Sequence, residues 1–132
     1  MLSETKGITA DQSGTFLFKP VTLQIQSVVY RNSFASVERA VLSLGRAVEL
    51  AFASGMVSRA ELAYGDSSPT PCLTEPQLSH LRGLYPDVLT IRYDFFNGNL
   101  GSARGHNRLA ASTDTAFILV QNPEVVDRKS VV

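Results

Sequence analysis

The side chains best suited to bind a ligand gather at four points along the chain, each directly after an apolar or alternating segment. The four groups are Tyr30 and Asn32; Asp66 and Ser68; Asn99, Gly101, Arg104 and Asn107; and Asn122 and Glu124. A carboxylate in such a group can hold a hard cation such as Mg²⁺ or Mn²⁺, which neutralises a diphosphate. Aspartate or asparagine can hydrogen-bond a nucleobase or a ribose, and backbone amides at a helix start can bind an anion. These residue types favour the binding of a phosphorylated ligand.

Each group taken alone also has a purely structural interpretation. Asp66 opens the sequence Asp-Ser-Ser-Pro, which is good turn chemistry, and the residues around Asn99 are equally typical of a turn. The segment Asn122-Pro123-Glu124 can simply end a strand. Neither the Walker A pattern nor the dinucleotide-binding glycine pattern occurs in the chain. The order of the groups therefore carries more weight than any one of them.

Three other side chains with reactive or ligating chemistry receive no such role. His80 is expected on the surface of a helix, and His106 is expected to pack or cap rather than to bind a ligand. Cys72 lies in a turn region without a clear base partner, so we assign it no catalytic function.

The segments between the groups predict alternating strands and helices. Apolar residues at spacings of three and four from Val37 to Ala51 indicate a helix that Ser33 or Ser36 can cap, and Thr74 with Gln77 indicates a capping box. The predicted strands cover residues 21–30, 60–64, 88–95 and 116–121, and the third helix covers 102–112. The run 116–121 is nearly continuous in apolar residues, so we expect that strand to be buried on both faces.

This order of elements predicts a mainly parallel sheet, and therefore one place for a site. Strands that alternate with helices form parallel sheets with right-handed crossovers. Ligands bind such sheets beyond the carboxyl ends of the strands, where all four groups fall. We predict three regions: a flexible leader over residues 1–20, an α/β domain over 21–126, and a tail over 127–132.

Composition excludes several other classes of protein. The 132 residues suffice for about one domain, and 44% hydrophobic residues with a formal net charge of 0 argue against disorder of the whole chain. The neutral charge provides no global field for nucleic acid, so no nucleic-acid partner is expected. No run approaches the roughly 18 apolar residues of a transmembrane segment, and the first 20 residues lack the apolar core of a secretory signal. A single cysteine fits a cytoplasmic location.

Four stretches together resemble the family-two glycosyltransferases. Residues 99–110 (NLGSARGHNRLA) resemble the family pattern N-x-G-x-a-x-g-x-N, and residues 116–125 (AFILVQNPEV) resemble its hydrophobic strand followed by L-N-P-D-V. Residues 28–32 (VVYRN) resemble the V-x-x-Y-N end of the first strand, and residues 65–68 (GDSS) resemble the D-N/D-G-S turn. The N-P-D form is similar to that of the rhamnosyltransferase-like branch.

The resemblance implies a fold and a set of site residues. It implies the GT-A fold of nucleotide-diphospho-sugar transferases, a three-layer α/β architecture with a mainly parallel sheet in the strand order third, second, first, fourth. It places Tyr30, Asn32, Asp66 and Ser68 around the nucleotide, with Asp66 on the base, and Asn99, Gly101, Arg104 and Asn107 beside the sugar-diphosphate. It makes Glu124 the ligand of a divalent cation, Mg²⁺ or Mn²⁺, although the family usually has aspartate there and Asn122 is a poorer ligand than its usual counterpart.

The resemblance covers only the donor-binding half of the family, from about residue 21 to residue 125. The acceptor half, which carries the general-base aspartate of this inverting reaction, has no counterpart, so no catalytic residue is assigned. We therefore expect the chain to bind a nucleotide-diphospho-sugar whose sugar passes to a hydroxyl of a glycan or another acceptor, with little or no transfer by the chain alone. The alternatives are a nucleotide-binding module without catalysis and a structural α/β domain. Self-association through an open sheet edge is expected in each case.

Overall fold

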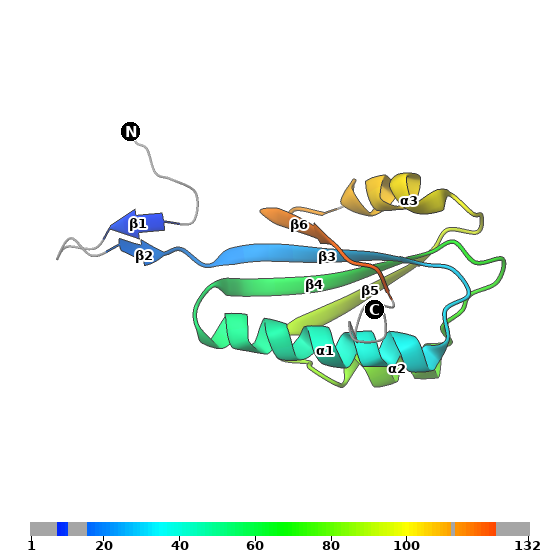
Figure 1. The fold of residues 1–132 in the computed structure, drawn as a ribbon, viewed down its shortest axis with the longest axis horizontal. Helices are drawn as coiled ribbons and strands as arrows, with labels where there is room; N and C mark the ends of the chain where they lie inside the picture. The colour runs from blue at the N-terminus through cyan, green and yellow to red at the C-terminus, as the bar shows by residue number, and fades with distance from the viewer. Residues whose placement is uncertain (1–7, 11–15, 112, 124–132) are drawn as a thin grey trace, which may run out of the picture.

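The centre of the molecule is a four-stranded parallel sheet. A computed structural model describes residues 8–10, 16–111 and 113–123 (Figure 1). The four strands are β3 (Val21–Val29), β4 (Val57–Asp66), β5 (Leu89–Phe95) and β6 (Phe117–Val120). They lie in the order β5-β4-β3-β6, and every pair is parallel. The α/β class and the parallel sheet expected from the sequence are confirmed, and the strand order is the one that the resemblance implies.

Helices cover both faces of this sheet, which gives three layers. Helices α1 (Phe34–Ala53) and α2 (Glu75–Arg82) lie on one face, and α3 (Gly101–Ala110) lies on the other (Figure 1). The larger core, between the sheet and α1 with α2, contains Ile25, Val41 and Leu62, all fully buried. A smaller cluster under α3 contains Leu109 together with Ala63 and Phe96.

The local sequence explains where the two crossover helices α1 and α2 begin. Ser33 precedes α1, and its hydroxyl accepts a hydrogen bond from the Ser36 amide at 3.2 Å. Of the two predicted candidates, Ser33 is therefore the residue that caps the helix. Thr74 and Gln77 form the predicted capping box at α2, with each side chain accepting from the other residue's backbone amide. These bonds satisfy amides that have no partner within the helix.

Two short strands precede the sheet, which corrects the prediction that regular structure begins at Val21. β1 (Ile8–Ala10) and β2 (Phe16–Phe18) pair antiparallel, with Ile8 opposite Phe18. Strands of three residues are too short to produce the sustained hydrophobic period by which a strand is recognised in a sequence. The tail predicted at 127–132 and residues 1–7 and 11–15 of the leader lie outside the described residues.

Strand β6 also differs from its prediction, because it is exposed, whereas the sequence predicted a strand buried on both faces. Its four residues are 44%, 44%, 52% and 60% exposed, from Phe117 to Val120. Among the described strands, β6 pairs only with β3, so it is an edge strand whose faces are incompletely covered. An apolar run alone does not distinguish a central strand from an edge strand.

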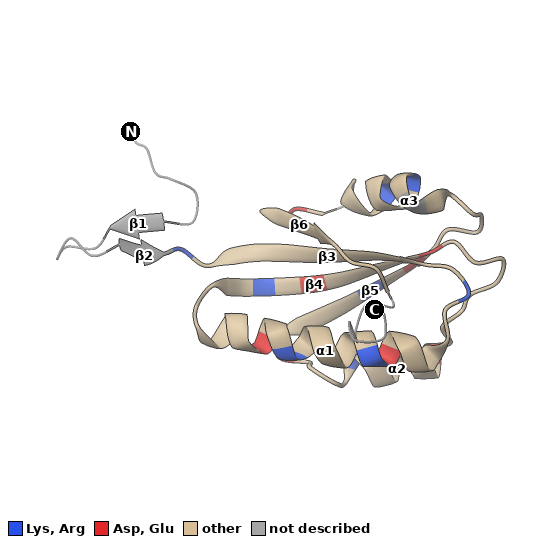
Figure 2. Ribbon diagram, in the orientation of Figure 1, with Lys and Arg blue, Asp and Glu red and all other residues tan. Residues whose placement is uncertain are grey.

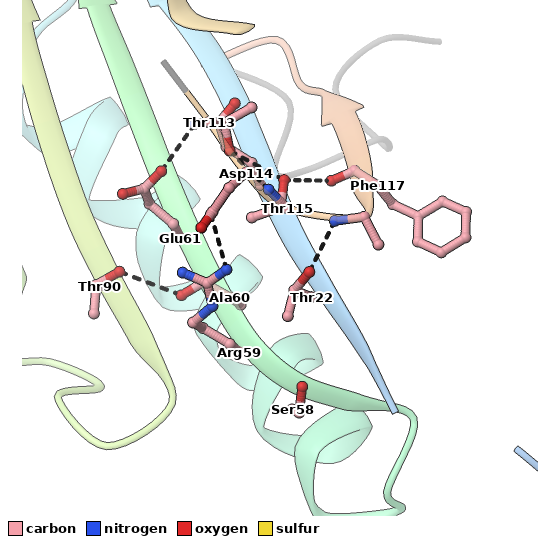
Figure 3. Close-up of polar contacts among 12 residues, drawn as sticks. Thr22, Ser58, Arg59, Ala60, Glu61, Thr90, Thr113, Asp114, Thr115 and Phe117 are labelled. Atoms are coloured by element: carbon pink, nitrogen blue, oxygen red, sulfur yellow. Dashed lines mark hydrogen bonds and ion pairs between the residues drawn. The ribbon is translucent and has the colours of Figure 1, made fainter. Parts of the chain in front are cut away.

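The connection from α3 to β6 is tied to the amino ends of β3 and β4 by polar contacts (Figure 3). Asp114 forms an ion pair with Arg59 at 3.0 Å, and the Ala116 amide donates to the Thr22 hydroxyl at 2.8 Å. The hydrogen bond and charge of Arg59 lower the pKa of Asp114 below its ordinary value. These contacts position the start of β6 beside β3.

Charged residues of both signs occur along α1 and along β4 (Figure 2). Within the described part of the chain, no helix is both long enough and apolar enough to span a membrane.

The close approach of α1 to Tyr85 predicts that Gly45→Ala destabilises the protein. A Cβ at residue 45 would lie 2.0 Å from the nearest atom of the Tyr85 ring. Alanine favours helix by about 1 kcal/mol over glycine, but overpacking of this kind costs about 1–3 kcal/mol. We expect the free energy of unfolding in urea to fall for Gly45→Ala and to rise slightly for Ser43→Ala, an exposed control in the same helix. A rise for Gly45→Ala would contradict the contact.

The exposure of β6 predicts that the chain self-associates. Apolar edge strands pair readily with other chains, and a lysine at such an edge opposes pairing. We expect the mass from light scattering to rise with protein concentration, and Leu119→Lys to reduce that rise. Leu50→Lys, at an exposed position on α1 (70% exposed), is the control and should leave the rise unchanged. A monomeric mass at all concentrations would refute self-association.

Candidate functional site

The described structure contains a pocket of about 350 Å³ at the carboxyl end of the sheet. Val28 and Tyr30 line it from the end of β3, and Ser67 lines it from the segment after β4. Asn99, Gly101 and His106 contribute from α3 and the loop before it, and residues 120–123 contribute from the end of β6. Four chain segments that are distant in sequence therefore meet at one site, at the edge where the sequence predicted it.

Three of the eight residues predicted to bind the nucleotide sugar line this pocket. They are Tyr30, Asn99 and Gly101. The other five, which are Asn32, Asp66, Ser68, Arg104 and Asn107, are outside the lining. Glu124, the predicted metal ligand, lies outside the described residues.

Asn32 and Ser68 hold the turn that presents Tyr30. The Tyr30 amide donates to Oδ1 of Asn32 at 2.9 Å, and the Arg31 amide donates to Oγ of Ser68 at 2.7 Å. Arg31 has a φ of 54°, a left-handed conformation that these two bonds stabilise. The Arg31 guanidinium lies 5.4 Å from the centre of the Tyr30 ring, within the range of a cation–π contact. Tyr30 itself is 46% exposed.

Asp66 organises the loop after β4 and is itself fully buried. Its carboxylate accepts hydrogen bonds from the backbone amides of Ser68 and Cys72, both at 2.8 Å, and from the Tyr93 hydroxyl. Burial raises the pKa of Asp66, but the hydrogen bonds from Ser68, Tyr93 and Cys72 outweigh it and hold this pKa below its ordinary value. The charged carboxylate is thus occupied by three protein donors, and contact with a base stays a prediction.

The start of α3 is shaped by Asn99 and Gly101. Oδ1 of Asn99 accepts from the Gly101 amide at 3.1 Å, and Gly101 has a φ of +77°, which a residue with a Cβ rarely adopts. The N-cap residue of α3 is Leu100, whose own side chain makes no capping hydrogen bond. Arg104 and Asn107 are exposed on α3, away from the pocket lining.

Ser67 and His106 are among the lining residues that were not predicted as site residues. Ser67 is 2% exposed, and its hydroxyl has no hydrogen-bonding partner among the described residues. The sequence could have indicated Ser67, because it lies in the GDSS motif between the predicted binding residues Asp66 and Ser68. His106 was expected only to pack or cap, because no pattern in the sequence shows which face of α3 meets the pocket.

The described lining of the pocket is electrically neutral. It contains hydroxyl, amide and imidazole groups, but no lysine, arginine, aspartate or glutamate. Among the described residues, no group of three or more His, Cys, Asp or Glu side chains could hold a metal ion. The oxygens of Asn99 and Asn122 alone would be a weak set for Mg²⁺ or Mn²⁺, which prefer carboxylates. The predicted cation therefore depends on Glu124.

A cluster of titratable groups lies beside the loop after β4, with Tyr64 and Asp66 buried and Cys72 and Tyr93 partly buried. Burial and the nearby charge of Asp66 raise the pKa of the Cys72 thiol to about 11, from an ordinary value of 9.0. Burial is also the main cause that raises the pKa of Tyr64 and of Tyr93, and the hydrogen bond to Asp66 adds to the shift of Tyr93. The cluster keeps Cys72 protonated and unreactive at neutral pH.

The shifted pKa of Cys72 predicts slow alkylation in the native protein. A rise of two pKa units lowers the thiolate fraction at about pH 8 by about 100-fold, so iodoacetamide should react at least that much more slowly than with the urea-unfolded chain. Cys72 is the single cysteine, so the rate is read from one site by mass spectrometry. Asp66→Asn, where it stays folded by circular dichroism, should react faster because the charge is gone. A native rate within tenfold of the unfolded one would contradict the raised pKa of this thiol.

The fold and the pocket define an α/β protein with an uncharged site of mixed polar and apolar lining at the carboxyl edge of a parallel sheet. Comparison with models of protein families, with curated proteins and with solved structures gives no match for this chain.

Proposed function

We propose that the pocket binds the nucleotide-diphospho-sugar donor of an inverting glycosyl transfer to an acceptor hydroxyl. The observation that carries this proposal is that Tyr30, Asn99 and Gly101 line a single pocket. These residues come from two of the four stretches that resemble the family-two glycosyltransferases, and the resemblance assigns all three to the donor. The GT-A fold is proposed on the same grounds.

The topology of the sheet supports a ligand at this place. From β3 the chain runs to β4 and β5 on one side, and β6 then pairs with the other edge of β3. The strand order therefore reverses between β3 and β6, and open parallel sheets bind ligands beyond the strand ends at such a point. The pocket lies there, between Tyr30 and residues 120–123. Its volume of about 350 Å³ falls within the range of small-molecule sites, so it holds part of a nucleotide sugar.

In this proposal Tyr30 supplies an exposed ring, and Ser67, Asn99 and Asn122 supply hydrogen bonds. The diphosphate is the leaving group, and a divalent cation would stabilise its charge. Glu124 would be the carboxylate that holds the cation. The exposed Arg31 lies next to the ring of Tyr30, at the same edge of the sheet.

A second candidate is a nucleotide-binding module without transfer. The observation that favours it is the absence of a carboxylate from the described pocket lining, because transfer with inversion needs a base for the acceptor proton. Binding without turnover distinguishes this candidate from the first.

Calorimetric titration with UDP-sugars and dTDP-sugars tests the binding proposal. We expect Tyr30→Ala to weaken binding about tenfold, because a base stacked on an aromatic ring contributes about 1–3 kcal/mol. Phe52→Ala is the matched control, since Phe52 is equally exposed (44% against 46%) but lies on α1. No heat with any of these nucleotides would refute the proposal.

The same titration in EDTA tests the cation. We expect weaker binding without Mn²⁺, and we expect Glu124→Gln to lose the response to Mn²⁺. Identical affinity with Mn²⁺ and in EDTA would remove the metal role of Glu124 while leaving donor binding in place.

A further inference from the structure

A row of polar side chains runs along one face of the sheet, from Glu61 on β4 to His106 at the pocket. Gln24 and Gln26, on the same face of β3 under α3, are 0% and 1% exposed. The Gln24 amide nitrogen donates to Oε1 of Glu61 at 2.8 Å, and the Gln26 amide nitrogen donates to Oε1 of Gln24 at 2.7 Å. Oε1 of Gln26 then lies 3.0 Å from Nδ1 of His106, which lines the pocket.

The direction of this row is set by its first member, Glu61. An ionised carboxylate can only accept hydrogen bonds, so Gln24 must present its nitrogen to Glu61 and its oxygen to Gln26. Gln26 must in turn present its nitrogen to Gln24 and its oxygen to His106. Turning the Gln26 amide over would let its nitrogen donate to the His106 carbonyl oxygen at 3.2 Å and to Nδ1 at 3.0 Å, and its oxygen accept from the Ala110 amide at 3.2 Å. It would also set the amide oxygens of Gln24 and Gln26 2.7 Å apart. Because the bond to Glu61 turns the Gln24 oxygen toward Gln26, the repulsion between those oxygens favours the first orientation.

We infer that Glu61, acting through Gln24 and Gln26, holds His106 as the neutral Nδ1–H tautomer, so that Nε2 is a fixed hydrogen-bond acceptor for a hydroxyl of the ligand. The tautomer follows because Oε1 of Gln26 accepts the Nδ1 proton, and a neutral imidazole then carries a lone pair on Nε2. Among the described residues, Nε2 has no hydrogen-bonding partner. Burial lowers the pKa of His106, which favours the same neutral form.

The surroundings of His106 favour a sugar hydroxyl over a phosphate. A bare Nε2 lone pair repels phosphate oxygens and accepts from a hydroxyl, and the described lining has no lysine or arginine to offset that repulsion. The unpartnered hydroxyl of Ser67, 2% exposed, opens on the same pocket and can donate to or accept from a polyhydroxylated ring. The part of the ligand that lies against His106 and Ser67 is thus the ribose or the transferred sugar.

The tautomer can be read directly from long-range ¹H–¹⁵N spectra of the ligand-free protein. The chain has two histidines, and His80 is the internal reference because its Nε2 lies 2.6 Å from Oε2 of Glu38 and must carry a proton. We expect His106 to show the Nδ1–H form near neutral pH. His106 in the Nε2–H form, or doubly protonated, would overturn the inference.

A pair of matched variants tests whether Glu61 sets the tautomer. The amide of Glu61→Gln can present either its oxygen or its nitrogen to Gln24, so both His106 tautomers should become populated. Glu49→Gln, the same change at an exposed position on α1, should leave the spectrum as in the parent protein. A purely structural role for the row would leave the His106 tautomer unchanged in both variants, and that result would overturn the role of Glu61.

The statement that Nε2 of His106 accepts from a ligand hydroxyl rests on the proposed function, since it concerns the same pocket. The statement about the His106 tautomer does not rest on it. Glucose should shift the His106 Nε2 resonance, and inorganic phosphate at equal concentration and ionic strength should not. A response to phosphate alone, or to neither probe, would overturn the assignment of a hydroxyl. Nucleotide-sugar binding that leaves the His106 resonance unshifted would overturn this inference and keep the proposed function. A shift of that resonance with glucose, without any binding of nucleotide sugars, would keep this inference and overturn the proposed function.

Discussion

The rest of the structure depends on the hydrogen bonding of β3 along both of its edges. β3 pairs with β4 over its whole length and with β6 over four residues, so it is the strand around which the sheet is assembled. Parallel pairing needs crossover helices, and these place α1 and α2 on one face and α3 on the other. The carboxyl ends of the strands must then meet at one edge, and Tyr30, Ser67 and Asn122 come together there because of that constraint.

The elements were accessible from the sequence wherever a local cause acts within a few residues. The caps at Ser33 and Thr74 are of this kind, because a hydroxyl and an amide three residues apart suffice for them. The exposure of β6 was not accessible, since an apolar run looks the same at the centre and at the edge of a sheet. The pairing of Ile8 with Phe18 was missed because each of the two strands has only three residues, too few to show a hydrophobic period.

The site was accessible only in part, and the reason is the direction of individual side chains. The order of the motifs pointed to the edge of the sheet where the pocket lies, and Tyr30, Asn99 and Gly101 line that pocket. Asp66, by contrast, is turned to the side of Tyr93 and Cys72, where three donors satisfy its charge. The buried glutamines of β3 looked like ordinary polar residues of an alternating strand, because nothing in a sequence shows that a histidine 80 positions away is their partner.

The exposure of β6 has a consequence for how the pocket behaves in time. A strand of four half-exposed residues that pairs along one edge has little buried surface to hold it, so it opens at a lower free energy than β3 or β4. Residues 120–123 form one wall of the pocket and follow directly from this strand. That wall can detach and return while the hydrophobic core on the opposite face of the sheet stays folded. Entry to the pocket and release from it are thereby separated from global unfolding.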